Sequence, residues 1–130
     1  MDFIDISAIF VQISRDRFNF IANLVLNCFM IVYNTTFHVD DDILSESIEY
    51  LKQEFIPSST RSGILSHPLL QRVLQDSEAG TSLCVQFRVK NQATLHEWIR
   101  LEGIVIQQKL VERFGSKMAG FSTLLDEIDL

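Results

Sequence analysis

The sequence predicts a mostly α-helical fold: a compact single-domain bundle of five or six helices over residues 1–130. Three observations favour this class. Residues 18–33 form an uncharged, largely apolar stretch that is too long for an ordinary strand. Residues 44–55 repeat apolar side chains every three or four positions, as amphipathic helices do, and residues 94–97 fit a capping box at the start of a long apolar-rich segment. Only residues 81–90 alternate strictly, which predicts at most one short strand or hairpin.

The first segment, residues 3–13, carries an apolar stripe. Phe3, Ile6, Phe10 and Ile13 recur at helical spacing and predict an amphipathic helix. The same segment is rich in Ile, Val and Phe, so a strand remains the alternative.

Residues 18–33 are predicted to form the central helix, which the rest of the chain covers. Asn19, Asn23 and Asn27 follow one another in steps of four and line a narrow polar stripe on an otherwise apolar cylinder. The stripe is either a seam at the solvent edge or a set of amides that hydrogen-bond across a helix–helix contact. The second reading makes these three residues interface candidates and implies self-association through the central helix.

The next segment is predicted to be a helix that begins after Asp40-Asp41-Asp42 and ends at Pro57. Residues 58–63 are rich in turn formers and predict an exposed loop. Ser66 or His67 then caps a short helix, with Pro68 in its first turn and Gly80 as a later stop.

Residues 81–90 show the half-buried strand pattern, with Leu83, Val85, Phe87 and Val89 on one face. A lone strand cannot satisfy its own backbone groups. It therefore pairs with the N-terminal segment, pairs across a dimer, or is converted to helix by its surroundings.

The last long helix is predicted to begin at Asn91 or Thr94 and to run to Phe114, with Gly115 beyond its end. Gly103 inside it favours the close approach of another backbone. Its apolar residues surround the axis, which indicates contacts on two sides. The interface candidates, apart from the three Asn residues, are Trp98, Leu101, Val105 and Ile106, together with Phe87 and Val89.

The chain closes with an acidic segment, residues 118–130, that is predicted to be an amphipathic helix docked on its own domain. Phe121, Leu124, Ile128 and Leu130 have the spacing of a leucine-rich export peptide, which makes them a candidate C-terminal peptide motif. Such short patterns recur by chance.

No catalytic or metal-binding constellation stands out in the sequence. Cys84 with His96 is the one nucleophile–base pair that can be assembled, and nothing in the sequence brings the two together. Neither cysteine has a CxxC partner, and Asp40-Asp41-Asp42 lacks the glycine and closing Glu of a calcium loop. We therefore expect no metal, no cofactor and no enzymatic activity.

The charge and hydropathy of the chain limit the kinds of partner that it can bind. A net charge of -6 opposes binding to nucleic acid, even though Arg88, Lys90 and Arg100 form a basic group. The sixteen residues of 18–33 fall short of the ~20 that a membrane-spanning helix needs. Two thiols without framework spacing and no convincing secretory signal favour an intracellular, cytoplasmic protein, with the nucleus as an alternative.

The sequence thus predicts a non-enzymatic protein–protein interaction module that self-associates, as a homodimer, and acts as an adaptor, regulatory or assembly subunit. The alternative is a helical carrier for an apolar ligand or lipid, with Phe18, Phe20, Phe29 and Met30 lining its cavity.

Overall fold

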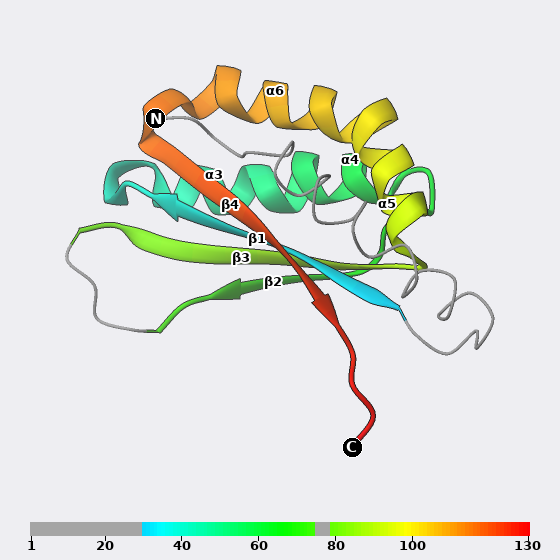
Figure 1. Cartoon of the computed structure of the whole chain (residues 1–130). Helices are drawn as coiled ribbons and strands as arrows, with labels where there is room; N and C mark the ends of the chain where they lie inside the picture. The colour runs from blue at the N-terminus through cyan, green and yellow to red at the C-terminus, as the bar shows by residue number, and fades with distance from the viewer. Residues whose placement is uncertain (1–29, 75–78) are drawn as a thin grey trace.

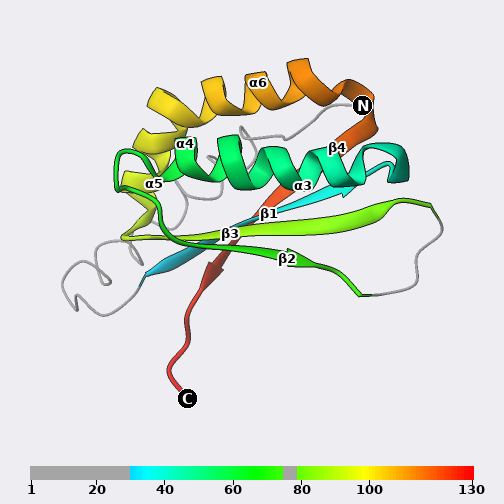
Figure 2. The same cartoon turned by 180° about the vertical axis from the view of Figure 1, so that it is seen from behind.

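The computed structural model describes residues 30–74 and 79–130. Four antiparallel strands form one sheet in the order β2-β3-β1-β4, and two long helices lie together on one face of it (Figure 1). The strands are β1 (Ile31–Val39), β2 (Ser66–Arg72), β3 (Thr81–Val89) and β4 (Met118–Asp126). The described residues therefore follow the order β-α-β-β-α-β, and the view from behind shows the same two layers (Figure 2). The prediction of a mostly α-helical bundle of five or six helices is wrong.

The first long helix consists of a 3₁₀ turn η1 (Asp41–Ile43), α3 (Leu44–Tyr50), a π turn η2 (Leu51–Phe55) and α4 (Ile56–Thr60). The acidic start is as expected, but Pro57 does not end the helix. In the π turn the N–H of Ile56 bonds to the carbonyl of Leu51, so the proline that follows lies in the first turn of α4. Proline has no backbone N–H to donate and is tolerated in the first turn of a helix. The loop predicted at 58–63 therefore begins only after Thr60, three residues later than expected.

The second long helix consists of α5 (Gln92–Trp98), a π turn η3 (Ile99–Gly103) and α6 (Ile104–Phe114), followed by a 3₁₀ turn η4 (Gly115–Lys117). Asn91 caps it, because its Oδ1 accepts a hydrogen bond of 2.8 Å from the N–H of Thr94. Gly115 follows the last helical residue with φ +57°. The predicted cap and end of this helix are confirmed.

The predicted strand at 81–90 is confirmed as β3, which pairs with both β1 and β2. β1 overlaps the end of the predicted central helix, whose residues 31–33 are extended instead. From Tyr33 to Val39 the buried side chains of β1 alternate and face the helices, and its β-branched residues suit a pleated surface. The rest of the predicted central helix and the predicted helix at 3–13 lie outside the described residues.

Two further predictions of helix are wrong. Residues 66–72 form β2, because the edge of β3 offers hydrogen-bond partners that a short isolated helix lacks. Pro68 is tolerated there because β2 is an edge strand with a register shift between Ser66 and Leu69. Residues 118–126 form β4, which pairs with β1 along its whole length, from Val39 opposite Met118 to Ile31 opposite Asp126.

The core lies between the sheet and the two helices. Phe37 of β1 meets Phe55 of the first helix edge-on, with ring centroids 5.6 Å apart. Tyr33 of β1 meets Trp98 of the second helix in the same manner at 6.2 Å. Leu83, Val85, Phe87 and Val89 of β3 are all buried in this layer. Each long helix is thereby held to the central strands by an aromatic pair.

Candidate interaction surfaces

The sheet has a second face, opposite the helices, on which no helix or strand of residues 30–74 and 79–130 packs. We call it the open face. The strand registers place the following side chains on it: Val32, Asn34, Thr36 and His38 of β1; Leu69 and Gln71 of β2; Ser82, Cys84, Gln86 and Arg88 of β3; and Ala119, Phe121, Thr123 and Leu125 of β4.

Large apolar side chains of the open face are exposed at its two edges. Phe121 and Leu125 of β4 are 61% and 48% exposed, and Leu69 of β2 is 48% exposed. A single exposed apolar residue is ordinary, but Phe121 and Leu125 stand on the same face of one strand, four residues apart. Together they form an apolar patch on a strand that pairs with β1 along its whole length.

The centre of the open face is polar and internally hydrogen-bonded. Thr36 Oγ1 lies 3.3 Å from Asn34 Nδ2 and 3.5 Å from Cys84 Sγ. His38 donates from Nε2 to the carbonyl of Ala79 at 2.9 Å, which leaves Nδ1 to accept from Ser82 Oγ at 3.2 Å. At the end of the face Arg88 forms an ion pair with Glu127. These groups are already partnered within the chain, so the apolar edges are the stronger candidates for contact.

The helix-facing side of β4 is tied to β1 by hydroxyl groups. Ser122 Oγ lies 3.0 Å from Thr35 Oγ1, and both residues are hydrogen-bonded to Tyr33. Burial of the Tyr33 phenol raises its pKa, and the hydrogen bonds with Ser122 and Thr35 offset part of that rise. This contact positions β4 so that Phe121 and Thr123 project to the other side.

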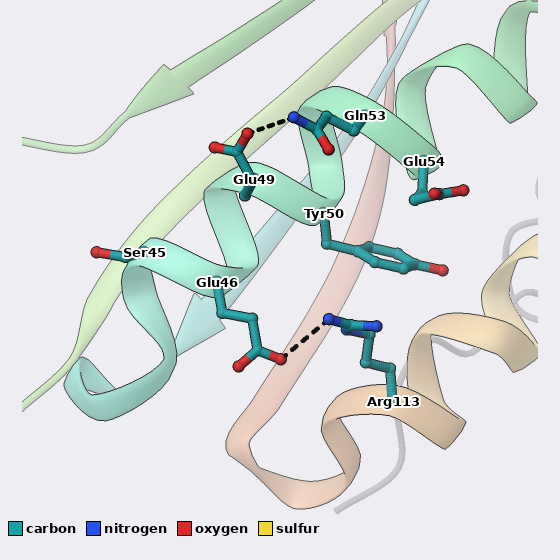
Figure 3. A pocket seen from close by; sticks show the side chains of 7 residues that line it. All are labelled: Ser45, Glu46, Glu49, Tyr50, Gln53, Glu54 and Arg113. Atoms are coloured by element: carbon teal, nitrogen blue, oxygen red, sulfur yellow. Dashed lines mark hydrogen bonds and ion pairs between the residues drawn. The ribbon is translucent and has the colours of Figure 1, made fainter.

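The helical layer has a polar hollow between α3 and α6, with a volume of about 470 Å³ (Figure 3). Arg113 crosses it toward α3, where its Nη2 lies 3.3 Å from Glu46 Oε2. The guanidinium also lies 5.3 Å from the ring centre of Tyr50 and 5.7 Å from that of Phe114. Burial raises the pKa of Tyr50, and the neighbouring Glu54 adds to the rise. These contacts join the two helices to each other.

A second hollow, of about 240 Å³, lies between the π turns of the two helices. Leu101, Val105 and Ile106 line it together with Phe55. Leu101 and Val105 are more than half exposed, and Ile106 is half-buried. The structure therefore places three of the predicted interface residues on the outer surface of the helical layer.

The remaining predicted site residues are placed differently. Trp98, Phe87 and Val89 are at most 3% exposed and belong to the core, so they are not available as a contact surface. Asn19, Asn23 and Asn27 lie outside the described residues, as do Phe18, Phe20 and Phe29 of the proposed ligand cavity. In the C-terminal motif Phe121 and Leu124 stand on opposite faces of β4, while Ile128 and Leu130 follow the strand and are exposed.

Sequence reasoning missed the open face because it missed the sheet. The available signal is the spacing of Phe121 and Leu125, because two residues four positions apart lie on one face of a strand as well as on one side of a helix.

The structure does not bring Cys84 and His96 together. Cys84 is on the open face of β3, whereas His96 belongs to α5 on the other side of the sheet. Within residues 30–74 and 79–130, no three His, Cys, Asp or Glu side chains are grouped as metal ligands would be. In the same part of the chain, no helix combines the length and the hydrophobicity that crossing a bilayer requires.

The chain matches a protein-family model. Residues 30–128 match the model of a family described as a domain of unknown function, DUF4286. The chain belongs to this family. The matched residues include all four strands and both helices, so the DUF4286 domain coincides with the sheet and its helical layer. A search of curated proteins finds no match.

Solved structures with the same architecture include an ethyl tert-butyl ether d (ethd) family protein from Bacillus halodurans, with 14% identity and a TM-score of 0.57 over 78% of this chain and 99% of that one. A dimeric ferredoxin-like protein from an uncultured marine organism has 12% identity and a TM-score of 0.56 over 78% and 98%. A Deinococcus radiodurans protein, described provisionally as an antibiotic biosynthesis monooxygenase, has 14% identity and a TM-score of 0.55 over 78% and 95%. At these identities the likeness establishes a ferredoxin-like α+β fold and nothing about activity.

Proposed function

We propose that this DUF4286 domain is a non-enzymatic protein–protein interaction domain that self-associates and serves as an adaptor, regulatory or assembly subunit. Its first partner is a second copy of the same chain. The observation that carries the proposal is the apolar patch of Phe121 and Leu125 on the open face, at the β4 edge of the sheet.

Two further observations support self-association. The side chains of Asn34, Thr36, His38, Ser82 and Cys84 on the open face already have hydrogen-bond partners within the chain, so covering them leaves fewer unpaired donors and acceptors. One solved structure of the same fold is described as dimeric, which makes an assembly of two such sheets a precedent, although the identity is only 12%.

The proposal is tested by measuring the molar mass of the purified chain by light scattering during size-exclusion chromatography. We expect about twice the chain mass of 14.9 kDa at micromolar concentration. Leu125→Lys should shift the mass toward that of one chain, because it places a charge in the patch. Leu101→Lys is the matched control: Leu101 is similarly exposed but lies on the helical layer, so this variant should remain a dimer.

A wild-type chain that remains monomeric at concentrations of hundreds of micromolar would refute self-association. If Leu101→Lys dissociates the dimer and Leu125→Lys does not, the contact lies on the helical layer and the open face is not the surface.

A further inference from the structure

The two edges of the sheet differ in how they resist pairing with another strand. β2 contains Pro68, has a register shift beside it and holds His67 at φ +52°, and it ends in Arg72. Proline, irregular backbone and charge are the features that keep an edge strand from pairing. β4 has none of them before its last residue, Asp126. Among the described residues β4 pairs only with β1, so its outer row of N–H and C=O groups has no strand beside it.

We propose that β4 pairs with β4 of a second copy, antiparallel and around a two-fold axis, so that the two four-stranded sheets join into one sheet of eight. This inference rests on the self-association proposed above and specifies its geometry. It uses the unprotected edge of β4 and leaves the blunted edge of β2 at the outside of the assembly.

The pattern of β4 selects the register. Side chains on a strand alternate between faces, so residues opposite one another across the two-fold axis must belong to the same face. With Thr123 opposite Thr123 of the partner subunit, Phe121 lies opposite the partner's Leu125, and Leu125 lies opposite the partner's Phe121. Aromatic–aliphatic and Thr–Thr pairs are favourable across antiparallel strands. Both exposed apolar side chains of each copy are then covered on one continuous open face.

Other registers with matching faces cover less apolar surface. Moving the axis to Ser122 sets Phe121 against Thr123 and Leu125 against Ala119. Moving it to Phe121 pairs the two Phe121 side chains but leaves Leu125 opposite the partner's Lys117, which precedes β4. The register centred on Thr123 is also favourable in charge. Within β4 the charged residue Asp126 lies opposite the partner's Gly120, so no two like charges oppose one another.

The geometry is tested with one cysteine substitution. In Thr123→Cys the two new thiols face each other across the axis, at a spacing that a disulfide can bridge. A mild thiol oxidant should convert most of the chain into a covalent dimer on a non-reducing gel. The wild-type chain, with its own two cysteines, controls for native thiols. Leu69→Cys is the matched control, since Leu69 is also exposed on the open face but belongs to the β2 edge, where it lies opposite Gln86.

A second variant pair tests the same geometry without oxidation. Thr123→Lys sets two like charges opposite one another at the axis and should weaken dimerisation by about fivefold or more. Gln71→Lys adds the same charge at the other edge and should leave the dimer constant unchanged. Both positions are exposed, so neither variant should lose its fold by circular dichroism.

The outcomes separate this inference from the proposed function. A dimeric chain in which Thr123→Cys fails to cross-link, or in which Leu69→Cys cross-links instead, overturns the β4–β4 geometry and leaves self-association standing. A chain that is monomeric in every form overturns both.

Discussion

Gly103 and Trp98 are in close contact across one turn of the second long helix: a Cβ at position 103 would lie 2.7 Å from Cζ3 of Trp98. The indole is buried and packs on its other side against Tyr33 of β1. The sequence predicted a close approach at Gly103, but of another backbone rather than of a side chain in the same helix. The glycine leaves room for the ring that joins this helix to the sheet.

Gly103→Ala is therefore expected to destabilise the domain. Alanine favours a helix by about 1 kcal/mol over glycine, but overpacking a buried site costs about 1–3 kcal/mol, so the net change is expected to be a loss. Denaturation by urea measures it, with Gln108→Ala on an exposed face of α6 as the control that should cost little. A gain in stability for Gly103→Ala would mean that the indole moves freely, contrary to this packing.

The Asn91 cap gives a second prediction. Replacing Asn91 by Ala removes the acceptor for the N–H of Thr94 and should lower the free energy of unfolding by about 0.5–2 kcal/mol. Asn91→Asp keeps an acceptor oxygen and should retain most of the stability. Thermal or urea unfolding of the three proteins checks this order. Equal losses in the two variants would show that the side-chain amide, rather than the cap bond, is what matters at this position.

Tyr33 predicts how stability depends on alkaline pH. Burial raises the pKa of its phenol above the ordinary value, so the folded protein holds this proton more tightly than the unfolded chain does. The stabilisation linked to this proton is fully present below about pH 10, the pKa in the unfolded chain, and is lost as pH rises through the folded pKa.

The variant Tyr33→Phe should show a smaller decline of the free energy of unfolding above pH 10 than the wild type. Urea unfolding at a series of pH values from 8 to 11 measures this decline. Tyr50→Phe is the comparison, because the pKa of Tyr50 is also raised by burial but its ring lies at the helix surface. If the wild type and Tyr33→Phe decline in parallel, the phenol of Tyr33 is not buried in solution as it is here.

Some elements could be predicted from the sequence because their signals are local. The alternation of Thr81–Val89 defines a strand, and the cap at Asn91 and the glycine at 115 define the ends of a helix, all within a few residues of the structure they specify. The signal for the start of the first helix, its acidic residues, is equally local. The end of this helix could not be predicted from Pro57, because the helix continues through a π turn at Leu51–Phe55 and past the proline.

The residues predicted to form a contact surface are divided between the surface and the core. Leu101 and Val105 are exposed and Ile106 is half-buried, whereas Trp98 is buried and packs against Tyr33. The patch of Phe121 and Leu125 was not predicted as a surface of a sheet, because nothing near residue 120 in the sequence indicates a strand partner at residues 31–39.

By itself, then, the sequence determined where polarity alternates, where helices are capped and which side chains are apolar. Only the tertiary structure decided that residues 31–39, 66–72 and 118–126 are strands. The physical reason is that a strand is completed by backbone groups far away in the chain. The hydroxyls of Thr35 and Ser122 lie 3.0 Å apart although the two residues are 87 positions apart in the sequence. No local sequence pattern predicts this contact.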